Sequence, residues 1–315
     1  MRDVTGRWIA TVAKALGNKK PDAFFYVLMT CYYSPMQKSF LRETATTVMK
    51  AMVVVLTVIV FVVSISTIYE AENNISDGTC NIAVYPVEGV ILPYYGIGDF
   101  ELITTPESLE SFMKTVEDED EIEGVLVEVN SPGGTPVASA RMADLLRNSS
   151  LPVMGMISDQ GTSGGYMIAA ATDYLLASPM SDVGSIGVNM SYVEESQKNE
   201  DEGLTYVQLT TGKFKDIGSP NRPITEEERR KLEADLQIVH NEFVALIAEY
   251  RGLSTEEVVA LADGSSMPGV KALEANLIDE LGGREEVREN FAKVLEKDPA
   301  EIVFCEYDSG FLPFY

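Results

Sequence analysis

The sequence has very few of the side chains on which most metal sites and catalytic triads depend. Its 315 residues include one histidine, His240, and three cysteines, with no Cys-x-x-Cys pair and no cluster of cysteine and histidine. Zinc and thiol redox sites use such clusters, so we expect no metal and no cofactor. His240 lies in a helical pattern with apolar neighbours, which favours a structural role over a histidine-based triad.

Positive charge is also scarce, and it is distributed unevenly. The chain has 24 Lys and Arg against 49 Asp and Glu, a net charge of −25. Residues 1–50 have eight basic and three acidic side chains, a net charge of +5, which leaves −30 for residues 51–315. Because an acidic surface repels phosphates, we expect no nucleic-acid partner.

An apolar run separates these two parts. Residues 51–69 are nineteen positions without a charge. At about 1.5 Å per residue, a helix of this length nearly spans a hydrocarbon core of about 30 Å, so we predict a transmembrane helix in the lipid bilayer. Lys50 precedes it and Glu70 follows it, which places the N-terminus in the cytoplasm and residues 70–315 outside. The alternatives are a buried core segment and a cleaved signal peptide, and the fifty preceding residues disfavour the latter.

The chain is therefore expected to have four parts. These are a cytoplasmic region (1–50), a single-pass membrane helix (51–69), a polar linker (70–80) and an extracytoplasmic domain (81–315). Cys80 and Cys305 lie near the ends of this domain. A disulfide between them and two separate buried thiols are both compatible with the sequence.

In the last part, short apolar strands alternate with helical patterns. We expect strands over 82–87, 124–129, 152–157, 173–177 and 183–190, and helices over 105–117, 136–147 and 163–171. Four helices, over 225–250, 254–262, 269–275 and 284–295, and a strand over 302–306 follow. This order predicts an α/β layered fold with mostly parallel strands.

Two glycine-containing turns each lie between a predicted strand and a predicted helix. One contains Gly133 and Gly134, and the other surrounds Ser163 and contains Gly164. Glycine lets the backbone direct N–H groups at a ligand, and a helix N-terminus favours negative charge. We therefore expect the amides of Gly134 and Gly164 to form an oxyanion site, with Ser163 as a nucleophile. An ordinary turn and a helix N-cap are the alternatives.

Lysine is the candidate base for Ser163, since the single histidine lies far away in the sequence. Lys213 and Lys215 follow about fifty positions later. The pKa of a free lysine is near 10.4, so a lysine base requires a dry pocket that lowers its pKa. Ser185 is a candidate for holding such an amine. From the residues alone, a solvated surface cation is the more usual role for either lysine, and nothing in their pattern separates Lys215 from Lys213.

Taken in order, these motifs resemble the signal peptide peptidase family of membrane-anchored serine proteases, which have a Clp-protease/crotonase-like fold. The resemblance covers about residues 82–283. Its motifs are VNSPGG (129–134), TSGGY (162–166), VGSIGV (183–188), FKDI (214–217), ADG (262–264), and AL (272–273) with LIDELGG (277–283). Residues 1–50 have no counterpart in this family, and Ser266–Pro268 replace its more usual aromatic-threonine run.

The resemblance implies a role for each candidate residue. It implies that Ser163 is the nucleophile, Lys215 the general base and Ser185 the residue that orients the lysine. It implies that Gly134 and Gly164 form the oxyanion hole. Family members assemble into homo-oligomers, and in short members the lysine can complete the site of a neighbouring chain, so a homo-oligomer is also implied.

The activity implied is that of a membrane-anchored serine endopeptidase. Its substrates would be peptides, either cleaved signal peptides or other apolar peptides at the membrane. One alternative is a protease that clips a stomatin-like membrane partner, although the lysine of such proteases usually lies nearer the serine in sequence. Another is an inactive oligomeric scaffold of the same fold. An acyl-CoA enzyme is disfavoured, because the charge of −30 would repel its nucleotide cofactor.

Overall fold

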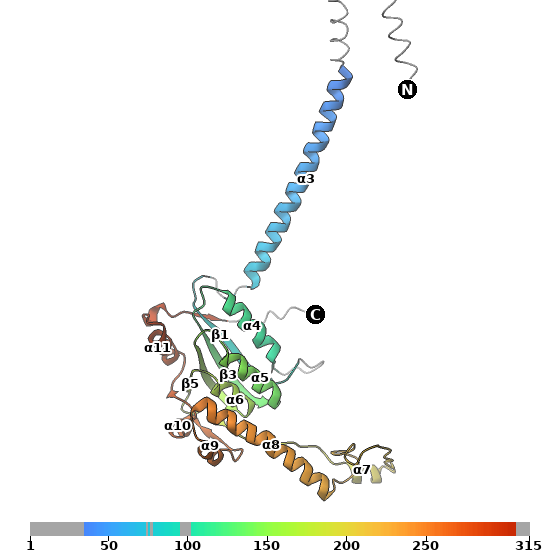
Figure 1. Ribbon diagram of the computed structural model, residues 1–315, viewed down its shortest axis with the longest axis vertical. Coiled ribbons are helices and arrows are strands. Elements are labelled where there is room, and N and C mark those ends of the chain that lie inside the picture. The colour runs from blue at the N-terminus through green and yellow to red at the C-terminus, as the bar shows by residue number, and fades with distance from the viewer. Residues whose placement is uncertain (1–34, 74, 76–77, 95–101, 307–315) are drawn as a thin grey trace, which may run out of the picture. The chain divides into compact units, whose positions relative to one another are not determined.

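The computed structural model describes residues 35–73, 75, 78–94 and 102–306 (Figure 1). The chain divides into two compact units, Met1–Glu72 and Asn73–Tyr315. The expected cytoplasmic region lies mostly outside the described residues.

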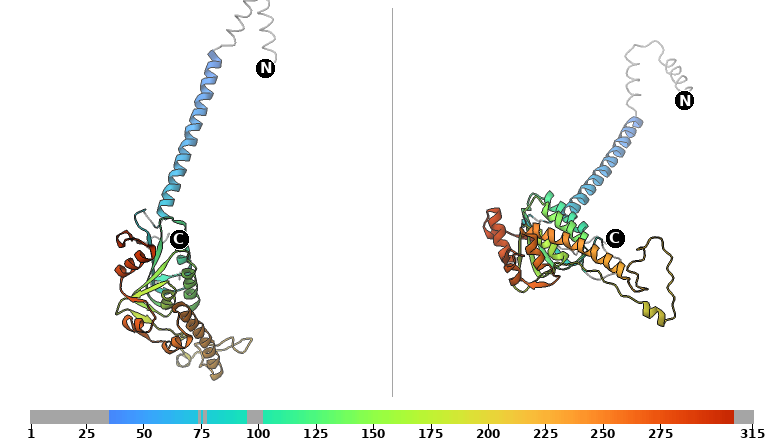
Figure 2. Two further views of the ribbon diagram at one scale, coloured as in Figure 1. Left: turned by 60° about the vertical axis from the view of Figure 1, so that its left-hand side comes forward. Right: turned by 60° about the horizontal axis from the view of Figure 1, so that its bottom comes forward.

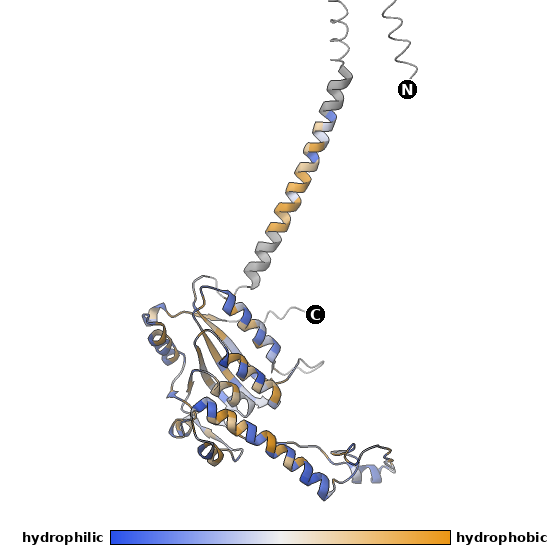
Figure 3. Cartoon of the chain, viewed as in Figure 1, coloured by the Kyte–Doolittle hydropathy of each residue, from blue (hydrophilic) through white to orange (hydrophobic). Residues whose placement is uncertain are grey.

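One long helix, α3 (Pro35–Asn73), leads into the second unit. Its segment Glu43–Val63 is long and apolar enough to cross a membrane, and the apolar stretch is visible in Figure 3. The expectation of one long apolar N-terminal helix is therefore confirmed. The helix continues to Asn73, so the first residues of the expected polar linker are helical.

A mostly parallel sheet forms the centre of the second unit. The longest strands are β1 (Ile82–Ile91), β3 (Gly124–Gly134) and β4 (Val153–Thr162), and the strand order is β2-β1-β3-β4-β5-β8. Strand β9 pairs with β1, β6 with β4, and β7 with β6, and β6–β7 is the one antiparallel pair among the described strands. The shorter strands are β2 (Ile103–Thr104), β5 (Tyr174–Ala177), β6 (Asp182–Gly184), β7 (Ser266–Pro268), β8 (Glu280–Leu281) and β9 (Phe304–Glu306). The predicted α/β fold with mostly parallel strands is confirmed.

Helices cover both faces of this sheet (Figures 1 and 2). They begin at residues that satisfy their first amides: the Thr105 hydroxyl accepts from Ser108 N, and Thr225 and Glu228 form a reciprocal capping box. The helices are α4 (Pro106–Asp118), α5 (Pro136–Arg147), α6 (Gly164–Ala170), α7 (Ser196–Asp201), α8 (Glu226–Arg251), α9 (Thr255–Leu261), α10 (Gly269–Glu274), α11 (Arg284–Leu295) and the 3-10 turn η1 (Pro299–Glu301).

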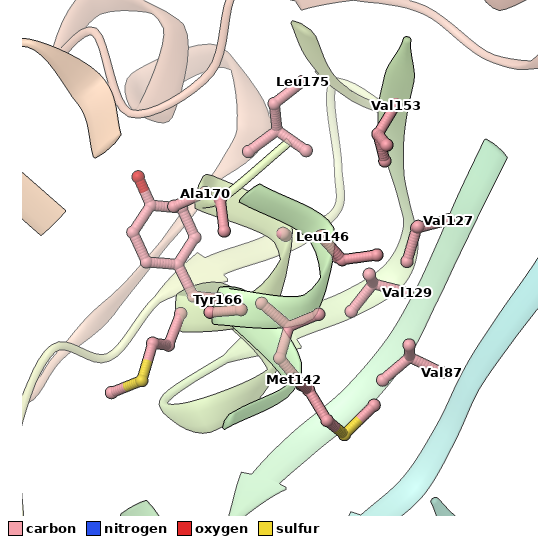
Figure 4. Packing of buried hydrophobic residues seen from close by; sticks show 14 of the residues in the cluster. Val87, Val127, Val129, Met142, Leu146, Val153, Tyr166, Ala170 and Leu175 are labelled. Atoms are coloured by element: carbon pink, nitrogen blue, oxygen red, sulfur yellow. The ribbon is translucent and has the colours of Figure 1, made fainter. Parts of the chain in front are cut away.

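The central strands are buried on both faces. In β3, Val127 and Val129 pack into the larger core with α5 and α6, as Figure 4 shows. Leu126 directly precedes Val127 and points to the other face, where it packs in a second cluster with Phe291 of α11. Strands buried on both sides read as continuous apolar runs, which is why the runs in this sequence do not alternate.

Two strands run further than their apolar residues predict. Strand β3 continues to Gly134, which pairs with Ile91, and β4 continues to Thr162. Small and polar residues occupy both extensions, so hydropathy alone does not indicate them. The strand expected over 183–190 ends at Gly184, and no regular element follows until α7. The expectation was wrong there, because these residues have no strand partner beyond the short β6 pairs.

A disulfide joins the two ends of the second unit. Cys80 and Cys305 are bonded, with their Cα atoms 5.2 Å apart. The pairing of Ala83 with Cys305 in the parallel β1–β9 ladder brings the two cysteines together. Of the two alternatives that the sequence leaves open, the structure therefore has the disulfide.

Candidate active site

The carboxyl ends of β3, β4 and β6 meet at one edge of the sheet. Thr162 of β4 and Gly184 of β6 are direct partners, so Ser163 and Ser185 are the next residues of two adjacent strands. The Ser163 amide donates to Gly184 O at 2.8 Å. Ligands of open parallel sheets bind beyond the carboxyl ends of the strands, which is where both serines lie.

Ser163 has a backbone conformation that non-glycine residues rarely adopt. Its φ of 53° and ψ of −122° match the first central residue of a type II′ turn, where glycine is usual. Such a conformation costs about 1–3 kcal/mol and persists only where the surrounding packing enforces it. Although Ser163 occupies the N-cap position of α6, its hydroxyl makes no capping hydrogen bond. The hydroxyl is therefore not committed to the helix.

Helix α6 fixes this conformation because it is buried along its whole length. Tyr166 is fully buried, and its hydroxyl donates to Leu277 O at 2.8 Å. Burial raises the pKa of Tyr166 further above its ordinary value, so the hydroxyl stays protonated and keeps this bond. Ser163 therefore precedes a helix that burial and the Tyr166 hydrogen bond hold in place.

The two glycine turns are in contact beside Ser163. Gly133 has a φ of +97°, and a Cβ on it would stand 2.6 Å from Gly164 N and 2.8 Å from the Cβ of Ser163. A Cβ on Gly164 would stand 3.2 Å from Gly134 N. Gly164 is the first residue of α6, so its amide has no acceptor within the helix. The structure therefore brings Gly134, Gly164 and Ser163 together.

A cavity of about 340 Å³ opens onto these three residues. Its floor is apolar, with Met167 and Phe243 buried and Leu246 half-buried. Exposed apolar side chains, Val137 of α5 and Ile238 of α8, form its rim. Such a cavity accepts an apolar side chain of a ligand next to the Ser163 hydroxyl.

One charged side chain lies among the residues that line this cavity. Glu242 of α8 is exposed at the rim, and its carboxylate makes no hydrogen bond or ion pair with the described residues. The contribution of α8 to the cavity was missed at the sequence level. Ile238 and Val239, one turn before Glu242, are exposed apolar residues, and only the structure shows this exposure.

Ser185 also has a positive φ, of 51°. Its hydroxyl donates to Gly264 O at 3.0 Å, and its amide donates to Ser265 O at 3.0 Å. Because the hydroxyl proton is committed to Gly264, the lone pairs of Ser185 Oγ remain available as acceptors. His240, by contrast, lies on α8 with Nε2 3.1 Å from Ala262 O and does not line the cavity.

Lys215 is the one predicted site residue that the chain does not bring to Ser163. It lies in a turn between α7 and α8, its side chain is exposed, and it does not line the cavity. Within the described residues its amine has no hydrogen bond or ion pair. Lys213 differs, because its amine contacts Glu227 of α8 at 2.5 Å. Figures 1 and 2 show the α7 region lying beside the N-terminal end of α8, away from the sheet.

A protein-family model covers the part of the chain that holds most of these residues. The model of peptidase family S49 matches residues 146–297, which include Ser163, Ser185 and Lys215. Gly134 lies before the matched region.

Three relatives illustrate the similarity. The chain is 30% identical to "Putative signal peptide peptidase SppA" of Enterococcus faecium, over 75% of this chain and 70% of that protein. It is 34% identical to "Putative protease MJ0651" of Methanocaldococcus jannaschii, over 61% of this chain and 63% of that protein. It is 32% identical to "Putative protease slr0021" of a Synechocystis strain, over 63% of this chain and 72% of that protein. The chain thus spans somewhat less than two thirds of the archaeal relative and more than two thirds of the other two.

Proposed function

The chain belongs to peptidase family S49, a family of serine proteases, and from this membership we propose that it is a membrane-anchored endopeptidase with a Ser163–Lys215 dyad. The observation that carries the proposal is the uncommitted Ser163 hydroxyl, on a strained turn at the mouth of an apolar cavity. Strained backbone of this kind is concentrated at catalytic sites.

In the proposed reaction, Ser163 Oγ attacks the carbonyl carbon of a peptide bond. The neutral amine of Lys215 takes the hydroxyl proton and then gives it to the departing amine of the substrate. The amides of Gly134 and Gly164 stabilise the oxyanion of the tetrahedral intermediate. The neutral lysine then removes a proton from water, and the resulting hydroxide attacks the acyl carbon. The bond to Ser163 Oγ breaks, and the lysine returns the proton to Oγ.

We propose that the base comes from a neighbouring copy of the chain. The exposed position of Lys215 leaves the site of a single chain without a base, while Lys213 is already paired with Glu227. In a homo-oligomer, the turn that carries Lys215 would insert its amine between Ser163 and Ser185 of the next chain. Desolvation at such an interface lowers the pKa of a lysine, as a general base requires.

The proposed substrates are apolar peptides at the membrane, including remnant signal peptides. The apolar floor of the cavity supports this, since apolar side chains gain by leaving water there. The N-terminal helix supplies the anchor. The disulfide supports an extracytoplasmic domain, because disulfides persist in oxidising compartments. In this arrangement, residues 1–50 are cytoplasmic.

Mixed oligomers test the dyad and its origin together. Full-length Ser163→Ala and Lys215→Ala chains are purified in detergent, tested separately, then dissociated and reassembled in equal amounts. Each alone should be inactive on a fluorogenic apolar peptide. If each site combines serine and lysine from adjacent chains, random mixing should restore about a quarter of the wild-type activity. Activity of either variant alone would contradict the dyad, and an inactive mixture would contradict the neighbouring-chain base.

A further inference from the structure

Arg222 binds both the turn that carries Lys215 and the start of α8. Its Nε donates to the Asp216 carboxylate at 2.9 Å, and one terminal nitrogen donates to the Asp216 carbonyl oxygen at 3.0 Å. The same guanidinium forms a two-pronged pair with Glu228, at 2.6 Å and 3.0 Å. Paired fork contacts of this kind fix the geometry more firmly than a single ion pair does.

These three side chains are less exposed than those of most other ion pairs among the described residues, and the Arg251–Asp279 pair is similarly shielded. Arg222 is 24% exposed, Asp216 16% and Glu228 6%. The nearby pair of Lys213 and Glu227 is exposed by 64% and 54%. Because this shielded cluster contacts the turn whose Lys215 is exposed, we interpret the cluster as fixing the position of that turn.

Glu228 connects the cluster to rigid structure. Its carboxylate also accepts from the amide and hydroxyl of Thr225, at 2.9 Å and 2.8 Å, in the capping box of α8. The Arg222 guanidinium, followed by Thr225, lowers the pKa of Glu228 to about 2, so this carboxylate stays ionised at neutral pH. Arg222 therefore ties the turn to a helix whose other half lines the substrate cavity.

Further contacts hold the turn and leave the Lys215 amine available. Tyr206 donates to the Asp216 carboxylate at 2.8 Å, and Lys213 pairs with Glu227. The positive charge of Arg222 also offsets the negative charge of Asp216, the immediate neighbour of Lys215. An unpaired carboxylate there would favour the charged form of the lysine, which is the wrong form for a base.

We propose that Arg222 is a positioning residue, which holds the Lys215 turn against α8 so that the amine is presented to the site of the neighbouring chain. This inference rests on the proposed function. It assigns Arg222 to the chain that supplies the lysine and gives it no role in the chain that supplies the serine.

Mixed oligomers separate this role from a general structural one. Arg222→Met is added either to the Ser163→Ala chain, which supplies lysine, or to the Lys215→Ala chain, which supplies serine. We expect the first mixture to lose at least tenfold of the restored kcat/KM and the second to stay within twofold. Arg229→Met is the matched control, since Arg229 is an exposed arginine in the first turn of α8, 3.9 Å from Glu226. It should change neither mixture.

The outcomes are distinguishable. Equal losses in both mixtures, or no loss in either, would overturn the positioning role. Arg222→Lys in the lysine-supplying chain should recover only part of the activity, because one ammonium cannot contact two carboxylates as a planar fork does. If the parent mixture is inactive although the wild type is active, the base acts within its own chain. The test is then Arg222→Met in the otherwise unchanged chain, where an at least tenfold lower kcat with unaltered KM supports the role and an unaltered kcat overturns it.

Discussion

Removing the disulfide between Cys80 and Cys305 should destabilise the catalytic unit without changing its chemistry. The bridge spans a sequence separation of 225 residues. Loop-closure entropy for a loop of this length predicts about 5 kcal/mol of stabilisation, and measured values for disulfides are typically about 2–4 kcal/mol. Taking about 3 kcal/mol, and about 2–4 °C per kcal/mol for a domain of this size, the Tm should fall by about 6–12 °C.

Activity should be unaffected at 25 °C because the bridge lies at the opposite edge of the sheet from the proposed site. Cys80 precedes the amino end of β1, and Ser163 follows the carboxyl end of β4. A strand of ten residues is about 33 Å long, so the two positions are well separated.

The assay compares wild type with the Cys80→Ser/Cys305→Ser variant by thermal unfolding and peptide hydrolysis, each with and without dithiothreitol. Reductant should lower the Tm of the wild type to that of the variant and leave the variant unchanged. A Tm that does not differ between the two proteins, or a kcat that falls at 25 °C in proportion to the lost stability, would refute the reasoning.

Three further predictions concern substitutions of single residues. Gly133→Ala should reduce kcat/KM at least tenfold, since its Cβ would press on Gly164 N at 2.6 Å, whereas Gly203→Ala, also at positive φ but in open space, should not; equal activity of the two variants would contradict this. Glu242 lies at the rim of the cavity, where its carboxylate can attract a positively charged substrate residue. Glu242→Gln should therefore lower kcat/KM about threefold to tenfold for peptides that have lysine next to the apolar residue that enters the cavity, but not for the same peptides with norleucine in place of lysine. Glu249→Gln on the same helix is the control, and an equal effect on both peptides would exclude a charge contact. The depressed pKa of Glu228 contributes stability that is complete above the ordinary carboxyl value of 4.5 and is lost as pH falls toward about 2. Arg222→Met should therefore lower the Tm more at pH 7 than at pH 2, and an equal Tm loss at both pH values would contradict this.

Much of the fold is predictable from local patterns. Helix α5 begins and ends where its proline, apolar spacing and length indicate, over 136–147. The capping box at Thr225 likewise marks the start of α8. Strands of two or three residues, such as β2 and β8, carry too few residues for any periodicity and depend on pairing with distant strands.

The candidate site also has a part that the sequence predicts and a part that it does not. Gly134, Ser163 and Gly164 come together because the ends of parallel strands share one edge of the sheet, which follows from the order of elements. The cavity wall supplied by α8 depends on how that helix docks, which no local pattern encodes. The surroundings of Lys215 depend on contacts beyond one chain in our proposal, so neither the sequence pattern nor a single copy of the fold determines them.

The pairing of β9 with β1 has a consequence for how this protein is made. Ile82 begins the ladder, and its partner Phe304 is translated more than two hundred residues later. Until then that stretch of β1 is an open sheet edge, the kind of surface to which other chains readily add. Contacts so distant in sequence also slow folding. The nascent chain therefore has a long vulnerable period, during which a chaperone that shields β1 would increase the yield of native protein.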